Sequence, residues 1–137
     1  MANRRDLLKL AGLPAFSALA AGASPKLPDA TVAAGQAKLS KESFGEQRVY
    51  FEGATDQVKS MTAGSVLLKP GAEPHPPHEH PEEEFLLITE GTGEITMAGK
   101  PTKVAPGAMM YVAAGHTHGI RNTGKTPMLF YYYKWQA

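Results

Sequence analysis

The sequence predicts an all-β domain, a small sandwich or barrel, over residues 46–137. Short apolar runs of strand length follow one another, and turn signals built on Gly and Pro separate them roughly every 8–12 residues. No amphipathic helical stripe occurs after residue 45. The chain has 137 residues, which suits a single domain.

The strand-like runs come in the following order along the chain. QRVYFEG at 47–53 is the first, and TAGSVLLKPG at 62–71 ends in a Pro-Gly turn. The segment 85–107 holds two apolar runs around a Gly-Thr-Gly turn and then a Gly-Lys-Pro turn. AMMYVAAG at 108–115 and PMLFYYYKW at 127–135 complete the set. This succession of runs and turns is typical of an antiparallel β domain.

The final run is apolar or aromatic on both faces of the predicted strand. Alternation places Met128, Phe130 and Tyr132 on one face. The other face carries Leu129, Tyr131, Tyr133 and Trp135. A small barrel covers one of these faces itself, so we expect the other to be covered by the N-terminal arm or by a second subunit. If a second subunit covers this face, the protein is a homodimer. The alternative is that the face stays exposed, with the tyrosine hydroxyls in water.

The first 23 residues have the features of an export signal. Arg4 and Arg5 form a basic start, and the uncharged stretch 10–23 is too short to span a bilayer but suits the apolar region of a signal peptide. Ala21-Gly22-Ala23 fits a cleavage site of small residues. An amphipathic helix is the alternative, which interruptions at Gly12, Pro14 and Gly22 disfavour.

The segment NRRDLLK resembles a twin-arginine (Tat) signal, although Asn3 and Leu7 depart from the usual residues. The resemblance implies export of a folded protein to the periplasm. Residues 24–45 then form a linker or N-terminal arm. Removal of residues 1–23 takes away three basic residues and one acidic residue, which changes the formal net charge from +1 to −1.

Composition excludes several function classes. The mature chain has no basic patch that would indicate nucleic acid, and no second apolar run that would indicate a membrane span. It has no cysteine, so neither a disulfide framework nor a thiolate zinc site is available.

The histidines are concentrated in two segments. HPPHEHPEEEF at 75–85 contains three of the five, and GHTHGIRN at 115–122 contains the others. On an extended strand His78, His80 and Glu84 point to one side, and a bend at Pro81 would let them approach a single ion. A fourth ligand would come from a facing strand, as His118 or His116.

Other side chains in these segments compete for the same roles. Glu82 shares the strand parity of Glu84, but its spacing from His80 fits a ligand less well. Glu83 could replace Glu84 as the ligand only if the number of residues after His80 varies. For both residues we favour a solvated turn. His75 and His116 break the pattern, which favours a place at the rim or behind the ligands. The alternative for the whole cluster is a set of surface histidines without a metal. The methionines are better explained as core residues than as ligands.

The two segments together resemble the two motifs of the cupin superfamily, over roughly residues 62–135. The first motif is matched by Gly71, His78, His80, Glu84 and Gly91, with one extra residue after Gly71. The second motif is matched by Gly107, Gly115, His118 and Asn122, with Ala113 where Pro is usual. Two spaced motifs in the right order are far more specific than a single His-x-His.

The resemblance implies a small jelly-roll β-barrel that binds one divalent transition metal through His78, His80, Glu84 and His118. Three imidazoles and one carboxylate suit Fe, Mn, Ni, Cu or Zn, and six-coordination would leave two positions open. We therefore expect a periplasmic metalloenzyme that acts on a small oxygen-bearing substrate, with the metal as a Lewis acid or as a redox centre. An oxidoreductase of the dioxygenase kind is one enzyme of this type. Glu73, His75 and His116 are the candidates for proton transfer.

A non-enzymatic module that binds a metal or a small ligand is the rival hypothesis, because no second catalytic group stands out in the sequence. A metal-free sugar-binding cupin is disfavoured, since all four ligand positions are filled.

Overall fold

The structure is a computed structural model, and it describes residues 25–137. The expected signal peptide at 1–23 therefore lies outside the described residues. Within the described part, no helix is long and apolar enough to cross a membrane. A three-residue 3-10 turn, η1 (Ala34–Gln36), is the helical element of this part.

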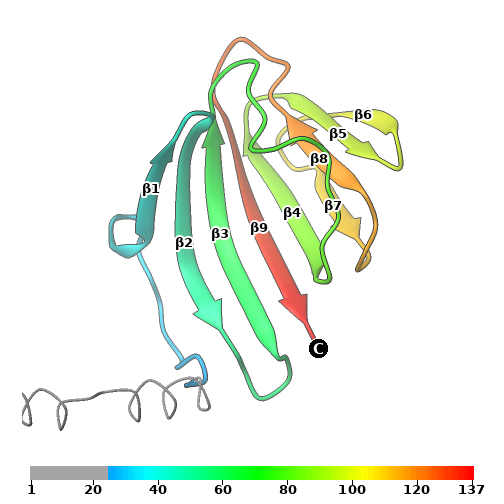
Figure 1. Cartoon of the computed structure of the whole chain (residues 1–137). Helices are drawn as coiled ribbons and strands as arrows, with labels where there is room; N and C mark the ends of the chain where they lie inside the picture. The colour runs from blue at the N-terminus through cyan, green and yellow to red at the C-terminus, as the bar shows by residue number, and fades with distance from the viewer. Residues whose placement is uncertain (1–24) are drawn as a thin grey trace, which may run out of the picture.

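Within residues 25–137, nine strands form two antiparallel sheets, so the predicted all-β class is confirmed. The larger sheet has the order β1-β2-β3-β9-β4-β7. Its strands are β1 (Lys38–Glu42), β2 (Gly45–Gly53), β3 (Ser60–Leu68), β4 (Glu83–Glu90), β7 (Met109–Val112) and β9 (Met128–Gln136). The smaller sheet has the order β6-β5-β8, with β5 (Gly93–Met97), β6 (Lys100–Val104) and β8 (His118–Arg121). Figure 1 shows the long curved sheet with β5, β6 and β8 gathered beyond β4.

Alternation along the strands builds the core between the sheets. Met128, Phe130 and Tyr132 on β9 are buried, whereas Tyr133 on the opposite face is 45% exposed. The face assignment made for this run is therefore confirmed. The same pattern on neighbouring strands completes a single cluster, whose buried members are Val66, Leu68, Leu86, Ile88, Ile95, Met110, Val112, Ile120, Met128, Phe130 and Tyr132.

Three strands differ from the sequence expectation, namely β1, β6 and β8. β6 includes Lys100 and Pro101, which the sequence assigned to a turn, and it is an exposed edge strand of the smaller sheet. Residues 38–42, which fell in the predicted arm, form β1 and pair along β2 at the edge of the large sheet. KLSKE carries no apolar run because an edge strand with exposed charges buries little. β8 is only four residues long and begins at a histidine, so it also gives no apolar run.

Asn122, the last residue of the second motif, lies fully buried at the end of β8. Its side-chain amide donates to the carbonyls of Leu68 (3.1 Å) and Thr126 (2.9 Å), and its side-chain oxygen accepts from the amide of Gly124 (3.0 Å). The asparagine thus supplies hydrogen bonds that the loop between β8 and β9 does not provide for itself. It holds the strand that carries His118 against the end of β3.

The core gives a direct test of this packing. Ile88 is 0% exposed in the core cluster, so we expect Ile88→Ala to lower the free energy of unfolding by about 2–5 kcal/mol. Met109 lies on the adjacent strand β7 but is 63% exposed, so Met109→Ala should change it by less than about 0.5 kcal/mol. Urea denaturation measures both changes. Equal effects would show that the two faces of the sheet are wrongly assigned.

The outer face of β4, β7 and β9 carries an aromatic patch, which we define as Phe85, Tyr111, Tyr133 and Trp135. The ring centroid of Phe85 lies 5.3 Å from that of Tyr111 and 5.5 Å from that of Trp135. Three of the four side chains are more than one-third exposed. The described part of the N-terminal arm, which we expected as one possible cover of this face, pairs with β2 and with Ala54.

Candidate metal centre

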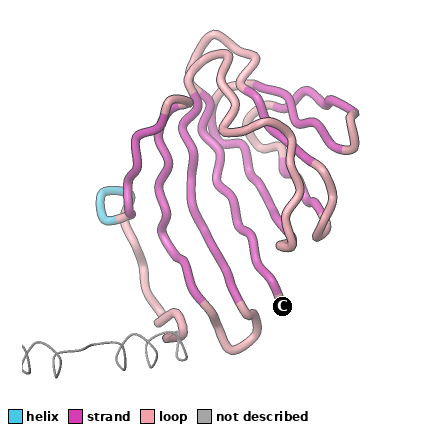
Figure 2. The backbone as a smooth tube through the Cα atoms, in the orientation of Figure 1, coloured by secondary structure: helices cyan, strands magenta, loops and turns pink. Residues whose placement is uncertain are grey.

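The long loop between β3 and β4 brings the first histidine segment to β8. Figure 2 shows this loop running from the end of β3 across to the smaller sheet before β4 begins. His78 in the loop and His118 at the start of β8 exchange two backbone hydrogen bonds, each 2.9 Å long. In such an antiparallel pair the two side chains project to the same side. Backbone pairing therefore joins the two motifs.

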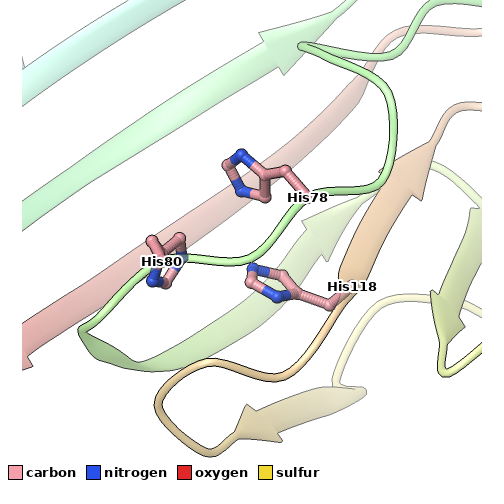
Figure 3. A group of neighbouring side chains, drawn as sticks. All are labelled: His78, His80 and His118. Atoms are coloured by element: carbon pink, nitrogen blue, oxygen red, sulfur yellow. The ribbon is translucent and has the colours of Figure 1, made fainter.

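His80 and Glu84 complete the cluster from the end of the same loop and from β4. Glu84 Oε2 lies 2.9 Å from His80 Nε2 and 3.0 Å from His118 Nε2. The ring centroid of His78 lies 5.1 Å from each of the other two imidazoles. Figure 3 shows the three rings beside one another between the loop and β8.

Backbone carbonyls set the orientation of two of the imidazoles. His80 Nδ1 lies 3.0 Å from the carbonyl of Glu82, and His118 Nδ1 lies 2.9 Å from the carbonyl of His116. A carbonyl only accepts, so each Nδ1 carries the hydrogen and donates it. In the contacts with the Glu84 carboxylate, Nε2 of each ring must carry a hydrogen, because a carboxylate only accepts. A metal would replace that hydrogen and bind the Nε2 lone pair of the neutral ring.

The cluster also shifts the ionisation of its own members. Burial opposes the charge of Glu84, but hydrogen bonds from His118 and His80 outweigh it, so the pKa of Glu84 lies below its ordinary value. The hydrogen bond to Glu84 raises the pKa of His118, against the effect of burial. Burial, followed by the neighbouring His75, His118 and His80, lowers the pKa of His78 to about 4. One carboxylate thus keeps its charge beside an imidazole that stays neutral.

The donor set fits a divalent transition metal. One ligand atom from each of His78, His80 and His118 lies within 4.8 Å of the others. Two atoms bound to one ion at about 2.0–2.2 Å lie at most about 4.4 Å apart, so small ring movements close the set. Imidazole nitrogens suit Fe, Ni, Cu and Zn, and a carboxylate also suits Mn. The three histidines can hold a metal, and Glu84 is placed to join them.

The cluster opens into a cavity of about 340 Å³ between the two sheets. This volume falls in the range of small-molecule sites. Its apolar wall includes Phe44, Val66, Leu86, Met110, Ile120 and Phe130. A ligand at the histidines would therefore sit in a largely apolar chamber.

The weaker sequence candidates lie in different places. His75 lines the cavity, and its ring stacks on that of His78 with centroids 3.6 Å apart. The side chains of Glu73 and His116 are exposed and do not line the cavity. His116 contributes its backbone carbonyl to His118 instead. Glu83 points outward, where its carboxylate accepts a hydrogen bond from the Tyr111 hydroxyl at 2.6 Å.

The cavity is also lined by three polar residues that the sequence alone did not indicate as site residues, namely Gln47, Tyr132 and Lys134. Tyr132 and Lys134 share the inward parity of Met128 and Phe130 on β9, and that parity was the available signal. Gln47 lies on β2 and donates from Nε2 to the Tyr132 hydroxyl at 2.8 Å. Its position depends on the pairing of β2 with β3, which a local pattern does not encode.

Metal affinity should fall as the pH falls. The pKa of His118 is raised above its ordinary value of 6.5 in the metal-free protein. As the pH falls through this raised pKa, His118 takes up a proton that competes with the metal ion. Glu84, with its lowered pKa, stays ionised, and His78 stays neutral down to about 4. One competing proton lowers the apparent affinity about tenfold per pH unit. A chelator competition from roughly pH 8 to 5 measures this, and a constant affinity would contradict a three-histidine site.

The fold and the cluster define a small β-barrel protein with a chamber lined by histidines that could hold a metal ion. The chain belongs to the cupin family: the model of the cupin domain matches residues 64–133, which include both histidine segments. The resemblance read from the two motifs is therefore confirmed, and the double-sheet barrel is a cupin jelly roll.

Known relatives agree with this assignment. The chain is 30% identical over 79 residues to dimethylsulfoniopropionate lyase DddW of Ruegeria pomeroyi, a match that covers 56% of this chain. The matched region covers 51% of the lyase, so the chain spans about half the length of this curated relative.

Solved structures share the fold at low identity. KdgF from Halomonas sp. superposes with a TM-score of 0.66 at 13% identity, over 80% of this chain and 96% of that one. A predicted oxalate decarboxylase from Thermotoga maritima gives 0.61 at 21% identity, over 79% of this chain and all (100%) of that one. At these identities the likeness shows the fold alone.

Proposed function

We propose that this protein is a metal-dependent cupin enzyme acting on a small oxygen-bearing substrate that binds beside the metal. The observation that carries the proposal is the junction of Glu84 with His80 and His118 at 2.9 and 3.0 Å, at the wall of a chamber large enough for a small molecule. The match to a lyase supports an enzyme over a passive binder.

The residues have distinct roles in this proposal. His78, His80, His118 and Glu84 hold the ion, and Glu84 supplies the single negative charge that offsets it. When bound, the metal supplies Lewis-acid or redox chemistry, with dioxygen as a possible co-reactant of the redox case. The apolar part of the wall lowers the local polarity beside the ion, which strengthens electrostatic interactions there. His75, stacked on His78, is the proton-transfer candidate that lines the chamber.

Elemental analysis of the full-length protein, purified from its native compartment, tests the metal part of the proposal. We expect one equivalent of a single transition metal per chain. Fe, Mn, Ni or Cu would favour redox chemistry, whereas Zn would favour Lewis-acid chemistry. A substoichiometric mixture of metals would contradict the enzyme and support the rival hypothesis, a metal- or ligand-binding module.

We further propose export through the twin-arginine route to the periplasm. NRRDLLK and the small-residue site at 21–23 support this proposal. Because that route carries folded proteins, the metal could be loaded in the cytoplasm. Cell fractionation with and without the route would test it, and a protein retained in the cytoplasm of both strains would contradict it.

The outer aromatic patch supports a homodimer. Exposed clusters of large apolar side chains commonly mark association surfaces. We expect sedimentation at micromolar concentration to give twice the chain mass, and Phe85→Ser with Tyr133→Ser to give a monomer. A monomeric wild-type protein would leave the patch to the solvent or to residues outside the described part.

A further inference from the structure

The inner face of β9 contributes two polar side chains to the chamber: Lys134, opposite Glu84, and Tyr132, whose hydroxyl lies toward Gln47 on β2. Lys134 is paired directly with Glu84 across β4 and β9, and Tyr132 is paired with Leu86. Opposed residues have Cβ atoms about 4.5–5.5 Å apart, and diagonal neighbours about 7–8 Å. Both side chains line the chamber that contains the histidines. The chamber that contains the histidine cluster therefore also contains Tyr132 and Lys134.

Tyr132 offers a hydrogen-bond donor to this chamber. Its hydroxyl is the acceptor for Gln47 Nε2 at 2.8 Å, which leaves its own hydrogen to donate. Within residues 25–137 the bond from Gln47 is the hydrogen bond that this hydroxyl makes. Burial raises the pKa of Tyr132, so the hydroxyl keeps its proton. Gly64 is what lets the phenol lie here, since a Cβ at that position would come 2.5 Å from the hydroxyl oxygen.

Lys134 offers a positive charge without a partner in the described part of the chain. Its neighbour Glu84 turns its carboxylate toward His80 and His118 instead. Within residues 25–137, no carboxylate lies within 4.0 Å of the Lys134 ammonium. Lys134 is a partly buried residue that lines the chamber together with apolar side chains, so an anion that enters the chamber can pair with its ammonium.

We propose that the chamber takes a small organic acid, whose carboxylate is bound by the Lys134 ammonium and the Tyr132 hydroxyl while its hydrocarbon part lies on the apolar wall. The inference rests on the proposed function, because it assigns a substrate class to the same chamber. One cation and one neutral donor match a single negative charge. A dianion such as a phosphate ester would be repelled by Glu84 and would lack donors, and a neutral molecule would leave the ammonium uncompensated.

Binding of butyrate and its neutral analogue butyramide to the full chain tests this proposal. Dissociation constants are measured by NMR titration, with zinc-loaded protein and with chelator-treated protein. We expect wild-type protein to prefer butyrate by about tenfold, the effect of one charge-assisted hydrogen bond, in both preparations. Lys134→Met should abolish the preference, and Lys134→Arg should retain it. Lys103→Met on the exposed strand β6 is the matched control and should change nothing.

Tyr132→Phe should weaken both probes while the preference for the acid remains, because the lost hydroxyl donates to either oxygen. Tyr133→Phe, on the outer face of the same strand, should leave both dissociation constants unchanged.

The outcomes separate this inference from the proposed function. A wild-type protein without a preference for butyrate overturns the inference. A preference that survives Lys134→Met but disappears with chelator shows that the metal binds the acid, which overturns the inference and leaves the proposed function standing. A preference that depends on Lys134 in a protein that binds no metal supports the inference and overturns the proposed function.

Discussion

His118→Ala should lower metal affinity by more than about 100-fold, while His116→Ala should leave it unchanged. His118 is 5% exposed, and its Nε2 meets the Glu84 carboxylate at 3.0 Å. Substitution of a group that only orients a ligand costs about 10–100-fold, and removal of a ligand costs more. His116 is exposed and contributes only its backbone carbonyl, which alanine retains.

The two variants form a matched pair because the residues lie two positions apart, His116 in the loop before β8 and His118 at its first residue. Competition with a chelating dye gives the affinities, and circular dichroism checks that both proteins fold. The reverse order, with His116→Ala the weaker binder, would overturn the alignment of the second motif.

Glu84→Gln should weaken metal binding at least about tenfold, because three neutral imidazoles would then hold a divalent ion without a compensating charge. The same change should bring the pKa of His118 back toward its ordinary value, since the hydrogen bond to Glu84 raises it. An NMR titration of the metal-free protein reads this shift, which a purely structural role for Glu84 would not produce.

Excess metal should refill the site of Glu84→Gln by mass action, yet turnover should stay below that of the wild type because the carboxylate charge is missing. Full recovery of turnover at saturating metal would reduce Glu84 to a simple ligand and contradict the redox form of the proposal. Glu83→Gln is the control, since that carboxylate lies on the outer face with Tyr111.

Much of the barrel could be predicted because its strands alternate. In PMLFYYYKW, the alternation of side chains along the strand predicts which residues share a face. The burial of Met128, Phe130 and Tyr132 on one face follows from this alternation. β1, β6 and β8 could not be predicted in the same way. β6 is an exposed edge strand without an apolar run, and its first two residues were assigned to a turn. β1 is a charged edge strand and β8 is a four-residue strand that begins with His118, so neither contains enough buried apolar residues to form a pattern.

In the candidate site, too, residues close in sequence could be predicted together, whereas neighbours brought together by strand pairing could not. His78, His80 and Glu84 lie close in sequence, and their shared parity placed them together. Strand parity left His118 and His116 open, and the spacing of the second cupin motif selected His118. The structure places His118 in the cluster through its backbone pair with His78. Lys134 could not be placed beside Glu84 from local sequence, since that neighbourhood is set by the register of β4 against β9.

Diffraction at the absorption edge of the bound metal, from crystals of the metal-loaded full chain, tests the central claim most directly. The account predicts one anomalous peak per chain, with Nε2 or Nδ1 atoms of His78, His80 and His118 and an oxygen of Glu84 within about 2.0–2.3 Å of it. A peak bound by His75 or His116, or no peak at saturating metal, would contradict it.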